Sequence, residues 1–207
     1  MSARDVTTAG PRVRGLVRVL LLGVLAIGLG SLGQGGWILV KARLAQVLLD
    51  RAFALERETG LPQKPWPWAD SHPVAKIEVP RLGVSEVVLD GGSGQALAFG
   101  PGHLSGSGEI GARDTAVLAA HRDTHFRFLG AVVRGEPITV TRTDGRQFEY
   151  RVTGTRVLAW NSFSIDRHPA RPTLDLVTCW PLGSLQPGPL RLVVSAEAID
   201  SSGHLGL

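Results

Sequence analysis

The pattern of hydrophobic and polar residues begins with a long apolar stretch. Residues 19–40 carry no charge, and as a helix rising about 1.5 Å per residue they would extend about 33 Å, enough to cross a bilayer. Trp37 and Lys41 lie at the end of the stretch, as aromatic and cationic residues often do at a membrane interface. We expect a transmembrane helix over residues 19–40. The alternative is a cleaved signal peptide, because Gln34 and nearby glycines weaken the second half of the stretch.

Residues 41–73 predict a helical stem followed by an extended linker. Prolines at positions 62, 65 and 67 exclude a helix there. We expect Trp66 and Trp68 to fold back over an apolar patch, with a role in recognition as the alternative. Before the linker, apolar residues recur at the spacing of one helix face. We expect this stripe to pack on the protein's own domain, with binding to a membrane surface or a partner as the alternative. Its members are Leu44, Val47, Leu48, Ala52 and Leu55.

From residue 74 onward the pattern is that of short β-strands, rich in β-branched residues and separated by turn signals. Asp144 and Gly145 form a strong hairpin-turn signal. Only short helices fit between the strands, around residues 95–99 and 126–129. The fold class we predict is mainly β, a closed or nearly closed eight-stranded barrel over residues 74–200, rather than a parallel α/β sheet. The expected strands are residues 74–79, 84–89, 115–119, 138–142, 147–152, 155–158, 174–179 and 190–195.

The net charge of +4 over 207 residues is concentrated before the apolar stretch. Arg4, Arg12, Arg14 and Arg18 stand there against a single acidic residue, Asp5. Positive charge on this side predicts that residues 1–18 are cytoplasmic and that the chain after the stretch lies outside. No basic stripe interleaved with aromatic residues follows, so we expect no nucleic-acid binding.

Three residues carry the candidate chemistry. Cys179 is the only cysteine, so outside the cytosol it is either buried and inert or retained because it reacts. The strand before it must end near Pro181, which places the thiol at a sheet edge. His121 follows an apolar strand-like run, and Arg191 alternates with leucines on another strand. Considered alone, each of these three residues could have a purely structural role. Together they supply the nucleophile, the acid and base, and the oxyanion donor of thiol-based acyl transfer.

A zinc site is a weaker alternative. His121 and His125 are four residues apart, and Asp123 and Cys179 would complete a set of ligands. However, Arg122 stands where the glutamate of an HExxH motif would be, and the residues that follow suggest a turn entering a short helix. We therefore expect no metal site here.

Several segments resemble one known family. AHRDTHFRFL at residues 120–129, LVTC at 176–179 and LRLVV at 190–194 are similar to motifs of the sortases, cysteine transpeptidases of bacterial surfaces. LGQGGW at 32–37, KPWPWAD at 64–70 and LAFGPGH at 97–103 resemble class GN sortases of Gram-negative bacteria. One departure is visible, because Asp175 stands where the family's TLxTC motif begins with threonine. This departure concerns local substrate contacts rather than the chemistry.

The resemblance implies an eight-stranded sortase barrel anchored in the bacterial inner membrane, with its catalytic domain on the periplasmic side. Cys179 would attack a backbone carbonyl in an LPxTG-like sorting motif near the C-terminus of a secreted protein. Arg191 would stabilise the oxyanion, and Thr178 would help to position the substrate. His121 would protonate the leaving amine and then deprotonate the amine acceptor that resolves the thioacyl enzyme. These steps need no metal or organic cofactor.

Two other functions remain as alternatives at this stage. One is a catalytically silent β-barrel that binds envelope proteins or glycans, which the presence of all three residue types in order disfavours. The other is an L,D-transpeptidase, which also uses cysteine and histidine in a β-rich fold. It does not match the local sequence, because no serine-x-glycine-cysteine segment surrounds Cys179.

Overall fold

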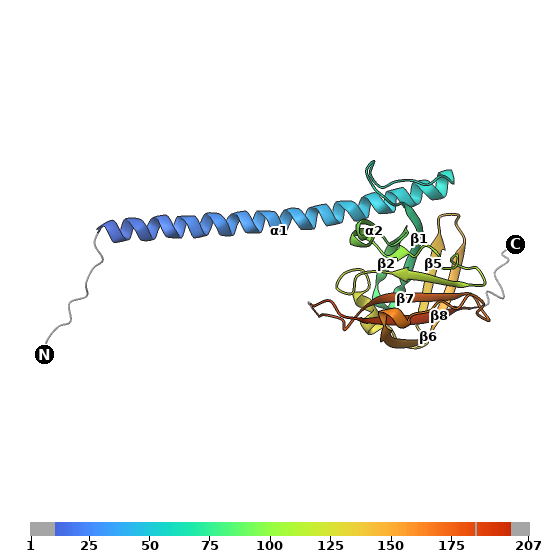
Figure 1. Cartoon of the computed structure of the whole chain (residues 1–207). Coiled ribbons are helices and arrows are strands. Elements are labelled where there is room, and N and C mark those ends of the chain that lie inside the picture. Colours follow the sequence, from blue (N-terminus) through green and yellow to red (C-terminus); the bar gives the residue numbers. More distant parts are fainter. Residues whose placement is uncertain (1–10, 185, 200–207) are drawn as a thin grey trace. The chain divides into compact units, whose positions relative to one another are not determined.

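Alternation of buried and less buried positions marks the strands of the computed structural model, which describes residues 11–184 and 186–199. In β1 every second residue is buried, as expected where one face of a strand packs on a core. The sheet closes on itself into a barrel (Figure 1). The order of its strands is β1-β2-β3-β4-β7-β8-β6-β5. The strands are β1 (Pro73–Val79), β2 (Val84–Asp90), β3 (Gly102–His103), β4 (Thr115–Ala119), β5 (Pro137–Arg142), β6 (Gln147–Ala159), β7 (Thr173–Trp180) and β8 (Leu190–Ala198).

The predicted mainly β, eight-stranded closed barrel is confirmed, although two of its strands differ from the expectation. The separate strands expected over residues 147–152 and 155–158 are one strand, β6, whose register with β8 shifts between Val152 and Gly154. A shift of this kind bends a strand without ending it. The eighth strand is β3, which pairs with β2 and β4 and is too short to produce a periodic pattern.

Short helices join the strands, as expected. Helix α2 (Gly94–Phe99) begins where the Ser93 side chain accepts a hydrogen bond from the Ala96 amide, which satisfies one of the free amides of its first turn. The remaining short elements are 3-10 helices: η1 (Pro80–Leu82), η2 (Arg127–Ala131) and η3 (Trp160–Ser162). The expected helix around residues 126–129 is therefore η2.

The barrel is filled by its own inward-facing side chains. Tyr150, Phe126, Leu118 and Ile138 are fully buried there, and each large apolar side chain contributes about 1.5 to 3 kcal/mol by leaving water. Tyr150 is also polar at one end, and its hydroxyl accepts a hydrogen bond of 2.9 Å from the Gly111 amide. Burial raises the pKa of Tyr150 to about 12, so the hydroxyl stays neutral in this core.

Helix α1 (Pro11–Thr59) runs through the boundary between the chain's two compact units, which lies after Leu44. Within the second unit, Leu49 and Phe53 pack against β2 and α2. Packing on the protein's own domain is thus confirmed, but most of the predicted stripe is wrong. Leu44, Val47 and Leu55 are exposed, and the buried face of the helix is Ala45, Leu49, Ala52, Phe53 and Glu56.

The linker after α1 behaves largely as its prolines predict. No helix or strand forms between Gly60 and His72. Trp66 stacks edge-on against Phe99, with ring centroids 4.7 Å apart, so one of the two tryptophans does cover an apolar patch. Trp68 does not, because it is 77% exposed.

The first unit contains the beginning of α1. Its large apolar side chains are exposed at consecutive positions, from Val19 (68%) through Leu20, Leu21 and Leu22, so they do not form a single packed face. Within the described residues, no helix has both the length and the apolar character needed to cross a membrane. The predicted transmembrane helix over residues 19–40 is therefore not confirmed.

Candidate active site

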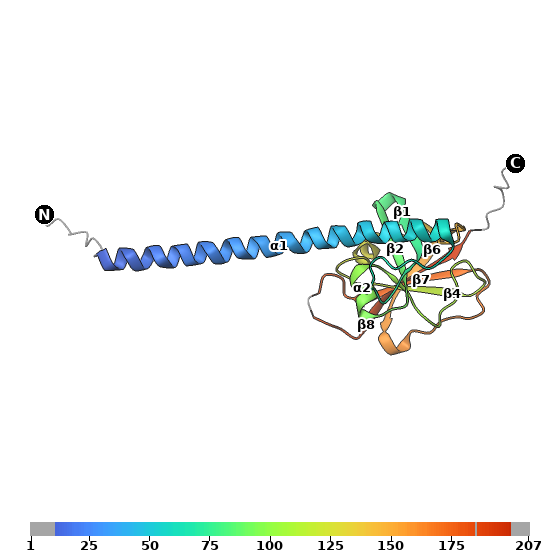
Figure 2. The same ribbon diagram turned by 90° about the horizontal axis from the view of Figure 1, so that it is seen from above.

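Strand pairing brings the three predicted catalytic residues to one level of the barrel. Cys179 on β7 lies directly opposite Arg191 on β8. On the other side of β7, β4 runs parallel, and Ala119 pairs with Val177. His121 follows Ala119 by two residues, so it comes level with Cys179. Neighbouring strands lie about 4.8 Å apart, which makes β4, β7 and β8 (Figure 2) the frame of one site.

These side chains occupy the outer face of the barrel. Leu176 and Leu192 belong to the interior core, whereas Val177 and Val193 pack together in a separate cluster outside it. Because side chains alternate along a strand, Cys179 and Arg191 share the outer face with these valines. Cys179 is half-buried and His121 is exposed. The site is therefore open to a ligand and has an apolar floor next to it.

Thr178 points to the opposite side and has a structural partner. Its side chain is 2% exposed, and its hydroxyl donates a hydrogen bond of 2.7 Å to the carbonyl of Ala120. The Ala120 amide in turn donates to the carbonyl of Val177 at 3.2 Å. Together these bonds hold the end of β4 against β7 at the residue before His121. The predicted substrate contact of Thr178 stays a prediction. The contact seen in the structure positions the backbone next to His121.

Arg191 is tied to the connection that precedes it. Its Nη1 donates to the carbonyls of Gly188 at 3.0 Å and Leu190 at 2.9 Å. Its Nε and Nη2 have no hydrogen-bond partner among the described residues. The guanidinium is thus held by one nitrogen and retains donors that can serve an oxyanion.

Arg122 is a site residue that sequence reasoning missed. It is 9% exposed, and its Nη2 donates to the carbonyls of Ser184 and Gln186, both at 2.6 Å. These carbonyls belong to the connection between Cys179 and Arg191. The residue after His121 therefore holds the segment that joins the other two candidate catalytic residues. In the sequence, only its position directly after His121 pointed to a role in the site.

His125, the second histidine of this segment, has another partner. Its Nδ1 lies 2.9 Å from a carboxylate oxygen of Glu86 on β2. Residues 122–126 form turns that lead into η2 rather than a helix, so His121 and His125 do not share one helix face. Among the described residues, no group of three or more metal-ligating side chains comes together.

Asp175, the departure from the family motif, lies four residues before Cys179 on the same outer face. It is 3% exposed. One carboxylate oxygen accepts a hydrogen bond of 2.6 Å from Ser195, and the other lies 3.4 Å from Nη2 of Arg156. Burial raises the pKa of Asp175 above its ordinary value, although both of these bonds act in the opposite direction.

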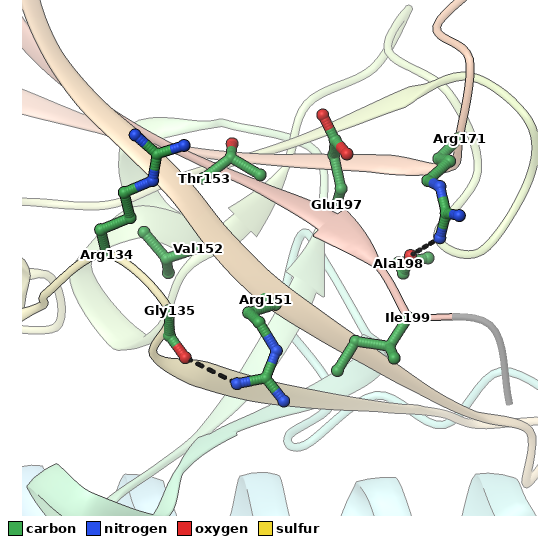
Figure 3. A pocket seen from close by; sticks show the side chains of 9 residues that line it. All are labelled: Arg134, Gly135, Arg151, Val152, Thr153, Arg171, Glu197, Ala198 and Ile199. Atoms are coloured by element: carbon green, nitrogen blue, oxygen red, sulfur yellow. Dashed lines mark hydrogen bonds between the residues drawn. The ribbon is translucent and has the colours of Figure 1, made fainter.

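A separate pocket of about 370 Å³ lies at the far ends of β6 and β8 from Arg191 and is bordered by three arginines (Figure 3). Arg151 donates to the carbonyl of Gly135 at 3.0 Å, and Arg171 donates to that of Ala198 at 3.5 Å. Its described lining includes neither a thiol nor an imidazole, so this pocket is not the candidate active site.

Comparisons with known proteins agree with this geometry. Residues 77–199 match the model of the sortase domain family. Over 200 residues the chain is 24% identical to sortase D of Bacillus subtilis (strain 168), covering 88% of this chain and 98% of that protein. The structure resembles sortase A from Corynebacterium diphtheriae, with a TM-score of 0.59 and 25% identity over 66% of this chain and 65% of that one. A Clostridium perfringens sortase D5 transpeptidase shares the fold, with a TM-score of 0.58 and 20% identity over 75% and 96% of the respective chains.

Proposed function

We propose that this chain, which belongs to the sortase family of cysteine transpeptidases, cleaves an LPxTG-like sorting motif in a secreted protein and transfers the product to an amine acceptor. The observation that carries the proposal is the register of three strands. It sets Cys179 opposite Arg191 and level with His121 on one open face. A silent binding module would have no need for all three groups at one level.

Each residue then has a defined task. The Cys179 thiolate attacks the substrate carbonyl, and the donors of Arg191 that remain unpaired among the described residues stabilise the resulting oxyanion. His121 donates a proton to the leaving amine, and a thioacyl enzyme remains. His121 then accepts a proton from the acceptor amine, which attacks the thioester and releases Cys179. The exposed imidazole and the half-buried thiol suit a site that must admit two substrates in turn.

The proposal extends to the inner membrane of a Gram-negative bacterium. The uncharged residues 19–40 and the exposed apolar side chains on successive positions of α1 support a membrane anchor, because water is an unfavourable solvent for such a surface. The arginines before residue 19 support a periplasmic catalytic domain. The class GN assignment rests on the segments at residues 32–37, 64–70 and 97–103.

The test uses the full chain in detergent, a fluorescence-quenched peptide with a Leu-Pro-Ala-Thr-Gly core, and an amine acceptor. Wild-type protein should cut the peptide, and intact-mass spectrometry should detect an acyl adduct on Cys179. Cys179→Ala and His121→Ala should abolish turnover, whereas His125→Ala should lose much less. Full turnover by the folded Cys179→Ala variant would exclude the proposed chemistry. Peptide binding without any cleavage by wild-type protein would favour the silent module.

A further inference from the structure

A carboxylate lies on the inward face of β2, where apolar side chains are the rule. Glu86 is directly opposite Ile77 in the antiparallel pair of β1 and β2, and Ile77 belongs to the interior core. Residues directly opposite one another in such a pair share a face, so Glu86 points inward as well. Its side chain is 26% exposed. A carboxylate in this position needs a partner, because burying a charge is costly unless the charge is hydrogen-bonded.

His125 is the partner of this carboxylate. Its Nδ1 lies 2.9 Å from Oε2 of Glu86, and the His125 side chain is 13% exposed. An ionised carboxylate only accepts hydrogen bonds, so Nδ1 carries the hydrogen and donates it. Within the described residues, the Glu86 carboxylate forms no other hydrogen bond or ion pair. The two side chains therefore hold each other, and they join the turn after β4 to β2.

The turn held in this way contains His121. The amide of Phe126, which belongs to the peptide bond after His125, donates to the carbonyl of His121 at 3.1 Å. Phe126 is fully buried in the core, whereas the tip of the turn, residues 123–124, is exposed. The contact of His125 with Glu86 and the burial of Phe126 thus fix one side of the turn. His121 stands on its other side.

The imidazole of His121 depends on this backbone for its position. The ring is exposed and makes no hydrogen bond or ion pair with any residue that the structure describes. No side chain orients it, so its placement relative to Cys179 follows from the backbone of the turn. Thr178 holds the start of this segment through the carbonyl of Ala120, and His125 holds its end.

We propose that His125, through its contact with Glu86, is a positioning residue for His121. The proposal rests on the proposed function, because it concerns the group that exchanges protons with the leaving and acceptor amines. The His125 imidazole is occupied by Glu86 and acts on the backbone of the turn, whereas His121 performs the proton transfer. Loss of the contact should therefore slow catalysis more than it weakens substrate binding.

The test measures cleavage of the peptide with the Leu-Pro-Ala-Thr-Gly core by the full chain in detergent. We expect His125→Ala and Glu86→Ala each to lower kcat about tenfold or more, the effect of a small misplacement of a catalytic group, and to leave KM nearly unchanged. The double variant should be no slower than either single variant, because both remove the same contact. His125→Asn should restore most of the lost kcat, because the asparagine amide supplies a donor close to the position of Nδ1.

Matched variants separate positioning from stability. Asp50→Ala removes a different ion pair, which joins α1 to Lys76 on β1 at 3.0 Å, and its kcat should stay native. Urea denaturation of the same samples reports the folded fraction, and kcat is calculated per folded protein. If His125→Ala fails to fold, Glu86→Ala still provides the test, because it leaves no unpaired carboxylate on the inward face.

The outcomes separate the positioning role from the proposed function. Absence of cleavage by wild-type protein would overturn both. Cleavage by wild-type protein together with native kcat in the folded alanine variants would overturn the positioning role alone. So would a loss confined to KM, additive losses in the double variant, an equal loss in Asp50→Ala, or a His125→Asn variant as slow as His125→Ala. A loss as complete as that of His121→Ala would contradict it too, because His125 would then act on the substrate directly.

Discussion

The hydroxyl of Thr178 offers the sharpest test of how the site is held together. Replacement by valine preserves the shape of the side chain and removes the donor that bonds to the carbonyl of Ala120 at 2.7 Å. The position is buried, so water cannot readily replace that donor. Leaving a buried acceptor without its partner costs about 1 to 3 kcal/mol. We expect Thr178→Val to lose stability in this range.

The effect on catalysis should exceed the effect on folding. Ala120 precedes His121, so loss of the bond frees the backbone that positions the imidazole. Small misplacements of a catalytic group reduce rates by roughly tenfold to a hundredfold. We expect a fall of this size in kcat/KM, carried mainly by kcat. In the wild-type structure the Ala120 amide donates to the carbonyl of Val177. We expect this amide to exchange its hydrogen faster in Thr178→Val.

Thr178→Ser is the matched control, because serine keeps the donor and loses only a methyl group. It should retain near-native kcat/KM and protection of the Ala120 amide while losing about 0.5 to 1.5 kcal/mol from the packing change. Urea denaturation, peptide turnover and amide hydrogen exchange should be measured on the same samples, so that the losses of stability, activity and backbone protection can be compared. A valine variant with native activity, or a serine variant equally impaired, would refute the positioning role.

Three further predictions concern neighbouring residues. Arg122→Gln removes the bonds of a buried guanidinium to the carbonyls of Ser184 and Gln186, so the melting temperature should fall and kcat/KM measured on folded protein should fall as well; native activity of the folded variant would contradict the bracing role. Arg191→Lys should lower single-turnover acylation about a hundredfold to a thousandfold with peptide binding retained, and a native acylation rate in folded protein would exclude an oxyanion role. Burial raises the pKa of Asp175 in the folded protein above its value in the unfolded chain. Asp175 therefore stabilises the fold at a pH below its unfolded-state pKa, and this stabilisation is lost as the pH rises through its folded-state pKa. The stability of Asp175→Asn relative to wild type should therefore increase from about pH 3 to about pH 7 in denaturant titrations, and a constant difference would contradict the raised pKa.

Much of the barrel could be predicted because most of its strands are long enough to show their periodicity. The exceptions have local physical causes. Strand β3 has only two residues, fewer than one alternation requires. The stripe on α1 was misplaced because two faces of that helix fit a helical spacing, and only the packing partners on β2 and α2 decide between them. A single helix cannot reveal which of its faces is covered.

The site itself was predicted unevenly. Cys179, His121 and Arg191 are recognisable because their side chains carry distinctive chemistry. Thr178 and Arg122 act by hydrogen-bonding to backbone carbonyls, and a backbone carbonyl is the same at every position of a sequence. Such contacts depend on how segments far apart in the chain meet. They therefore require the three-dimensional structure.

Strand register connects the candidate site with the hydrophobic core of the barrel. Asp175, Val177 and Cys179 share the outer face because they are spaced by two on β7. Their partners on β8, which are Ser195, Val193 and Arg191, repeat that spacing. A slip of one residue would turn every one of these side chains into the barrel. The inward-facing Leu174 and Leu176 are fully buried, so such a slip would also place the core residues in water. The hydrophobic core therefore fixes the positions of Cys179, Arg191 and Asp175 on the outer face together.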